Sequence, residues 1–238
     1  MRMSLLVAAL IGVVAVGSAR DPLPDPALKA VTEADIAYLT KTLDAKVEKR
    51  AVNTVKATAM LLALAAQKDG NGALQEHALA VAGALAGKEK DFAAAKAAAG
   101  KLAGATGGTP KAVALHEQHK FDLDQLMSVF RAGKVGGLNM EKDIKDQGKK
   151  LTDVKLAEVT GARLVLIADY TAKYPHTDAT GPKKKQWDDW TKEMGDLGAA
   201  VAAEAGKGAK ADKSLVEKKL KALEVNCAAC HSVFRDGK

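Results

Sequence analysis

Lys56-Ala-Thr-Ala-Met-Leu-Leu-Ala-Leu-Ala-Ala66 is built almost entirely from alanine, leucine and methionine, which are among the strongest helix formers. The rest of the 238-residue chain has the same bias, because it is rich in Ala, Lys and Leu and only 4% of it is aromatic. Apolar residues recur at helical spacing, and strand-like alternation is absent. We therefore predict an all-α protein.

Turn signals built on Gly, Pro and Asn divide the chain into helical segments. The predicted helices lie near residues 32–68 (with a break near 50 left open), 73–87, 89–103, 111–133, 151–173, 183–205 and 212–235. The last four have the number and size expected of one four-helix bundle, a fold that holds cofactors between facing helices.

We place a domain boundary at Gly107-Gly108. This predicts an N-terminal helical domain, which contains no cysteine, over residues 20–108 and a four-helix bundle over residues 109–238. The boundary is chosen because it leaves the whole predicted helix 111–133 to the bundle.

Similar segments within the chain suggest how the N-terminal domain arose. Lys56–Ala66 resembles Val159–Ala168, so the smaller domain is either a degenerate duplicate of the bundle or an unrelated small bundle. A second internal similarity competes with this one: Ser128-Val-Phe-Arg131 is repeated as Ser232-Val-Phe-Arg235. It would move the domain boundary to about residue 135.

Residues 1–19 have the pattern of a cleaved signal peptide: Arg2, an apolar stretch over residues 5–17, and a small residue at Ala19. The stretch is shorter than the roughly 20 residues that span a bilayer. We expect cleavage after Ala19 and a mature protein in the periplasm or otherwise exported, not embedded in the membrane. An uncleaved anchor is the alternative.

The formal net charge of +7 is a mild excess, and basic residues are interleaved with acidic ones along the chain. This pattern indicates solvated helix faces and argues against a nucleic-acid-binding stripe. Lys183-Lys184-Lys185 is the one local cluster, either a solvated loop or a contact for an acidic partner.

Both cysteines of the chain fall in Cys227-Ala-Ala-Cys-His231. On a helix, two cysteines three residues apart lie on nearly one face, where their thiols can reach the two vinyl groups of a haem. The adjacent histidine can then ligate the iron, so the motif indicates one covalently attached haem c. The alternatives are a zinc site completed by His116 or His119, a redox-active dithiol, a disulfide and free thiols.

Cys227-Ala-Ala-Cys-His-Ser-Val-Phe-Arg235, followed at once by the chain end, resembles class II c-type cytochromes, the cytochrome c-prime family. The resemblance covers roughly residues 109–238 and is specific at the motif. It implies a four-helix bundle with haem near its C-terminus, an aromatic residue at Phe234, and Arg235 beside the haem propionates. A guanidinium group suits that role, although a solvated arginine is the alternative.

The family's first helix carries the sixth iron ligand in low-spin members, a methionine usually preceded by leucine. Leu126-Met127 is similar to that segment and aligns Met127 with the ligand. The chain departs from the family at Leu123, where a basic residue is usual. An open distal site, His119, His116 and Met140 remain alternatives.

These features predict a one-electron carrier that works with an unidentified redox partner protein, not an enzyme. The alternative is a five-coordinate haem protein that binds nitric oxide or carbon monoxide. Trp187 and Trp190 pack either on the haem or in the core, and a homodimer is left open because class II relatives often dimerise.

Overall fold

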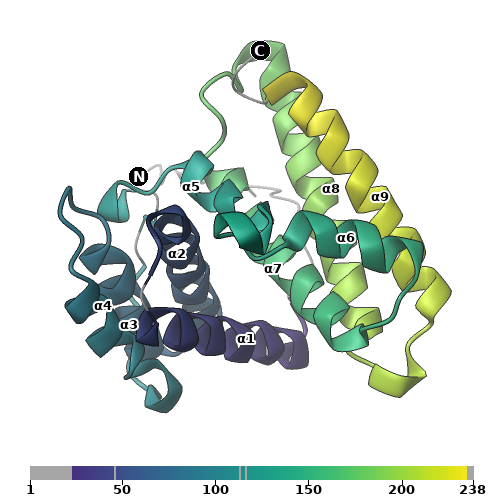
Figure 1. Ribbon diagram of the computed structural model, residues 1–238. Coiled ribbons are helices and arrows are strands. Elements are labelled where there is room, and N and C mark those ends of the chain that lie inside the picture. Colours follow the sequence, from purple (N-terminus) through teal and green to yellow (C-terminus); the bar gives the residue numbers. More distant parts are fainter. Residues whose placement is uncertain (1–22, 46, 113, 116, 235–238) are drawn as a thin grey trace, which may run out of the picture.

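The computed structural model describes residues 23–45, 47–112, 114, 115 and 117–234, and this part of the chain contains nine α-helices and no strand (Figure 1). The helices are α1 (Asp25–Asp44), α2 (Val52–Lys68), α3 (Gly72–Ala84), α4 (Phe92–Ala99), α5 (Leu123–Met127), α6 (Met140–Lys149), α7 (Val154–Lys173), α8 (Gly181–Ala205) and α9 (Lys213–Phe234). The all-α prediction is confirmed. None of the described helices is long and apolar enough to cross a membrane. The expected signal peptide, residues 1–19, lies outside the described residues.

Helix α2 is the central helix of the N-terminal half. Helices α1 and α3 pack against it, and so do α5 and α7 from later in the chain. Every residue from Thr54 to Ala66 is buried. A helix that is apolar on all sides requires neighbours on all sides, which explains this central position. Helix α4 completes the half by packing on α3 and α1.

Helices α6 to α9 pack in a closed cycle: α7 lies along α8, α8 along α9, α9 on α6, and α6 on α7. Helices α7 and α8 approach most closely where Gly161 meets Gly198. A Cβ atom at Gly161 would lie 2.7 Å from the carbonyl oxygen of Gly198. Because glycine has no Cβ atom, the two backbones can touch there.

The two halves of the chain share one continuous hydrophobic core that extends from Leu23 to Leu223. Helix α1 packs on α7, and an ion pair between Asp35 and Arg163 joins them. The Arg163 Nε atom donates to Asp35 Oδ1 at 3.1 Å, and Nη2 donates to the same oxygen. Both side chains are buried. A charge removed from water needs such a partner, so this pair fixes α1 on α7.

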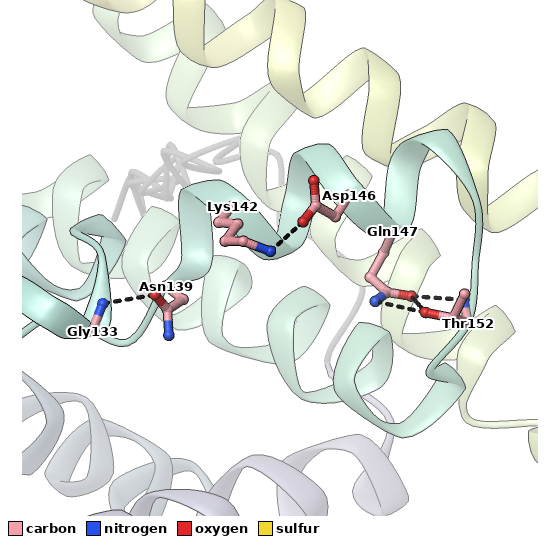
Figure 2. A network of polar contacts seen from close by, with 6 residues as sticks. All are labelled: Gly133, Asn139, Lys142, Asp146, Gln147 and Thr152. Carbon is pink, nitrogen blue, oxygen red and sulfur yellow. Dashed lines mark hydrogen bonds and ion pairs between the residues drawn. The ribbon is translucent and has the colours of Figure 1, made fainter.

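Polar contacts hold both ends of helix α6 (Figure 2). Before its first turn, Asn139 Oδ1 accepts a hydrogen bond from the Gly133 backbone nitrogen at 2.6 Å. In its last turn, Gln147 Oε1 accepts a hydrogen bond at 2.9 Å from the backbone nitrogen of Thr152, which lies beyond the helix end. These bonds fix α6 even though most of its side chains are polar.

The predicted helix 111–133 is wrong. Among the described residues of this range no α-helix begins before Leu123, where the Asp122 side chain accepts a hydrogen bond from the Gln125 backbone nitrogen at 2.8 Å and caps the start of a new helix. Helix α5 ends at Met127, and a 3₁₀ turn over Ser128–Phe130 leads to an extended Arg131. The chain then folds back, with the Asn139 nitrogen donating to the Arg131 carbonyl at 2.9 Å.

The other helices follow the prediction more closely. The break near residue 50 is present, between α1 and α2, and α1 begins at Asp25, earlier than residue 32. Helices α7, α8 and α9 agree with the predicted ranges within a few residues. Helix α6 was missed because Met140 and Ile144 are its only large apolar residues, which gives too weak a pattern.

Candidate haem site

The motif cysteines continue the buried stripe of helix α9. Its buried apolar residues are Val216, Leu220, Leu223 and Phe234. Cys227 and Cys230 fall between them at the same alternating spacing of four and three residues, so they point to the same side as the core residues. Both are partly buried, and neither forms a disulfide.

A cavity of about 480 Å³ lies against this end of α9, and elements from α5 to α9 line it. Cys227, Cys230 and His231 line it from α9, and Met127 lines it from the end of α5. Four of the five residues singled out in the sequence therefore meet at one cavity. The fifth, Arg235, lies outside the described residues.

Aromatic side chains form one wall of the site. Trp187 is buried and packs edge-on against Phe234, with ring centroids 5.1 Å apart. Trp190 lies 6.0 Å from the same phenyl ring. Both tryptophans also line the cavity. Each therefore packs α8 on α9 and forms part of the cavity wall.

A hydrogen bond anchors the indole of Trp187. Its Nε1 atom donates to the Thr171 carbonyl oxygen of α7 at 3.0 Å. In a continuing helix this carbonyl would accept from residue 175, which is Pro175 and has no N–H. The tryptophan thus satisfies a helix-end carbonyl and fixes its own ring at the edge of the cavity.

Asn226 fixes the motif on α8. It is buried, and its Nδ2 atom donates to Glu193 Oε2 at 2.8 Å and to the Trp190 carbonyl oxygen at 3.3 Å. Because Asn226 directly precedes Cys227, these bonds set the position of the first cysteine. The sequence analysis did not single out Asn226. A lone asparagine next to buried apolar residues could have indicated it, because a buried amide needs hydrogen-bond partners.

Both thiols are electrostatically unactivated. Burial, followed by the neighbouring Cys230 and Glu141, raises the pKa of the Cys227 thiol to about 11. Burial also raises the pKa of the Cys230 thiol to about 11. A redox-active dithiol instead has a lowered thiol pKa, so these cysteines are protonated at neutral pH and lack that property.

The structure separates two of the remaining candidates, Met140 and His119, from the cavity. Met140 is fully buried and does not line it. His119 lies against α3, where a Cβ atom on Gly83 would be 2.8 Å from its ring. His116 lies outside the described residues. Among the described residues, no group of three or more His, Cys, Asp or Glu side chains is arranged to hold a metal ion.

Two residues near the site were not singled out in the sequence. Met194 lines the cavity from α8 and provides a second thioether there. His176 is buried beside the tryptophan wall, with its ring centroid 5.7 Å from that of Phe234 and its Nδ1 atom accepting from the Asp178 nitrogen at 3.1 Å.

No protein-family model, curated protein or solved structure matches the chain. The argument for function therefore depends on the residues of this site.

Proposed function

We propose that the chain is an exported monohaem c-type cytochrome that carries single electrons. The observation that supports this most is the cavity lined by Cys227, Cys230, His231 and Met127 together. Two thiols on one helix face and a following histidine are the attachment set of haem c. A thioether from a different element is a common second axial ligand.

The size and the lining of the cavity are also compatible with haem. Its volume of about 480 Å³ lies within the range of cofactor pockets. Trp187, Trp190 and Ile144 supply apolar surface, and Lys145 supplies a cation on the same cavity. Bound there, haem supplies an iron that takes up and releases one electron, at a potential set by its axial ligands and its burial.

Each residue then has a defined task. Cys227 and Cys230 would hold the group, and His231 would provide a nitrogen ligand to its iron. Met127 would provide a sulfur ligand, which would raise the reduction potential relative to nitrogen or oxygen donors. Arg235 and Lys145 are the cations suited to the propionates. The two tryptophans keep water away from the site.

The proposal includes a four-helix bundle of the cytochrome c-prime kind, formed by α6 to α9. Its support is the closed packing of these helices and the motif in the last turns of α9. The departure is the element that carries Met127. In the resembled family a long first helix bears the ligand, whereas here α5 has five residues and precedes α6.

The first test is the absorption spectrum of protein matured in a periplasm. We expect sharp reduced bands, no change under carbon monoxide, and in the oxidised protein the weak long-wavelength band of iron bound to methionine sulfur. A reduced spectrum that shifts under carbon monoxide would instead favour the gas-binding function. Protein that takes up no haem would refute both.

Two methionine variants identify the ligand. Met→Leu conserves volume and removes only the sulfur, so the core should tolerate it. We expect Met127→Leu to abolish the long-wavelength band and to allow carbon monoxide to bind. Met194→Leu is the matched control on the same cavity, and we expect it to change neither property. The reverse result would make Met194 the ligand.

Export and partnership belong to the same proposal. Cleavage after Ala19 would deliver the chain to the compartment where haem c is attached, which mass spectrometry of the mature N-terminus tests. A redox partner protein must supply and accept the electron. Sedimentation of the haem-loaded protein would decide between a monomer and a homodimer.

A further inference from the structure

The N-terminal half carries no chemical motif, yet its central helix contacts the segment that bears Met127. We refer to residues 119–130 as the Met127 segment. Lys56 of α2 is 3% exposed, and its Nζ atom donates to the His119 carbonyl oxygen at 2.8 Å. The same atom donates to Gln125 Oε1 at 2.7 Å. One buried ammonium group thus holds two points on the N-terminal side of Met127.

A second contact holds the C-terminal side. Thr54, two residues earlier in α2, donates from Oγ1 to Ser128, with distances of 3.3 Å to its carbonyl oxygen and 3.2 Å to its Oγ atom. Ser128 Oγ in turn donates to the Gln125 carbonyl oxygen at 2.6 Å. The bonds from α2 therefore enclose Met127 between residues 125 and 128.

The Met127 segment has little regular structure with which to hold itself. A helix of five residues is far below the length of about 12 residues at which isolated helices become marginally stable. His119 has a left-handed backbone with φ of 59°, and the chain after Phe130 is extended. Leu126 and Val129 are fully buried and anchor the segment in the shared core. Its position is consequently set by what it packs on, which includes α2.

We infer that α2 acts as a support for the distal ligand: Lys56 and Thr54 are positioning residues that keep the Met127 sulfur in the haem cavity. This inference rests on the proposed function. It gives the haemless half a task, which is to hold a ligand that the described residues place on a helix of only five residues. It also predicts that the ligand becomes easier to displace when bonds from α2 are removed, although neither residue lines the cavity.

The test compares three single variants of the full, haem-loaded chain. Thr54→Val and Lys56→Met keep side-chain size and remove the bonds to the Met127 segment. Thr58→Val is the matched control, because Thr58 is also buried in α2 but donates to the Thr54 carbonyl oxygen within the helix, at 2.8 Å. The measurements are imidazole affinity of the oxidised protein, the intensity of the long-wavelength band, and the thermal midpoint.

One lost hydrogen bond corresponds to a change of about fivefold in an equilibrium constant. We expect Thr54→Val to raise imidazole affinity about fivefold and Lys56→Met, which removes bonds from a charged group, about tenfold or more. The long-wavelength band should weaken in both. Thr58→Val should lower the thermal midpoint by a similar amount to Thr54→Val but leave imidazole affinity within about twofold, because the hydrogen bond that it removes stays within α2.

The outcomes separate this inference from the proposed function. If the unmodified protein shows methionine ligation but Thr54→Val behaves like Thr58→Val, the positioning role is overturned and the carrier function stands. If the unmodified protein shows no methionine ligation, both are overturned. Should Lys56→Met fail to fold, Thr54→Val alone still decides the question.

Discussion

Replacing Gly161 by alanine tests the packing of the two helices that carry much of the site. The new methyl group would lie 2.7 Å from the Gly198 carbonyl oxygen and 2.7 Å from the Ala202 nitrogen, whereas ordinary contacts begin near 3.4 Å. Both neighbours are backbone atoms of α8 and cannot rotate away, so α7 and α8 must separate by several tenths of an ångström. Overpacking of this kind costs about 1–3 kcal/mol, and the better helix propensity of alanine returns up to about 1 kcal/mol.

We therefore expect Gly161→Ala to lower the free energy of unfolding by about 1–2 kcal/mol, which corresponds to a fall in Tm of about 2–8 °C. Urea unfolding followed by helical circular dichroism measures it. Gly100→Ala is the control, because Gly100 has a helical φ of −61° and a Cβ atom there would meet its nearest neighbours at 3.6 Å. Equal stability of the two variants would refute the close contact between α7 and α8.

Three further predictions concern other parts of the fold. Trp187→Phe leaves the Thr171 carbonyl without its indole donor and should cost about 1–3 kcal/mol in urea unfolding; an unchanged midpoint would contradict the role of that bond. Burial lowers the pKa of His119 below its ordinary value of 6.5, so the unfolded chain binds the proton first as pH falls. Stability should be complete above pH 6.5 and be lost as the pH drops through the lower, folded pKa, and His119→Gln should remove this dependence. Asp35→Asn leaves the buried Arg163 charge uncompensated and should cost about 3–5 kcal/mol, while the double variant Asp35→Leu with Arg163→Met should recover most of the loss.

The sequence pattern was sufficient to predict a helix where the information lies within the helix itself. The range of α9 could be predicted because its buried residues recur at helical spacing. Helix α7 is buried at every residue from Ala157 to Ala168, and its end could be predicted because a turn signal at Tyr174-Pro175 follows it. The cysteines and His231 could be found because the motif is specific without any tertiary information. These parts of the fold and site depend on residues close together in sequence.

The parts that could not be predicted depend on contacts between distant residues. Apolar spacing suggested a helix over 111–133, but Lys56, far earlier in the chain, binds the His119 carbonyl and holds an irregular backbone there. The Asp122 cap is a local signal that starts a helix at Leu123, and it interrupts the longer helix that the apolar spacing predicts. Met194 could not be distinguished in the sequence from an ordinary core methionine, since only the fold brings it to the same cavity as Met127.

The stripe on α9 restricts how this protein can change in length. Packing residues and the proposed haem-attachment residues occupy one line along the helix, so a single residue inserted between Val216 and Cys227 would turn the motif by about 100° relative to the core. Insertions there are tolerable only in steps of about three or four residues, which restore the face. The connection between α8 and α9, over residues 206–212, is not bound by that rule. Natural variation in length should therefore accumulate in that loop and stay out of the helix that follows it.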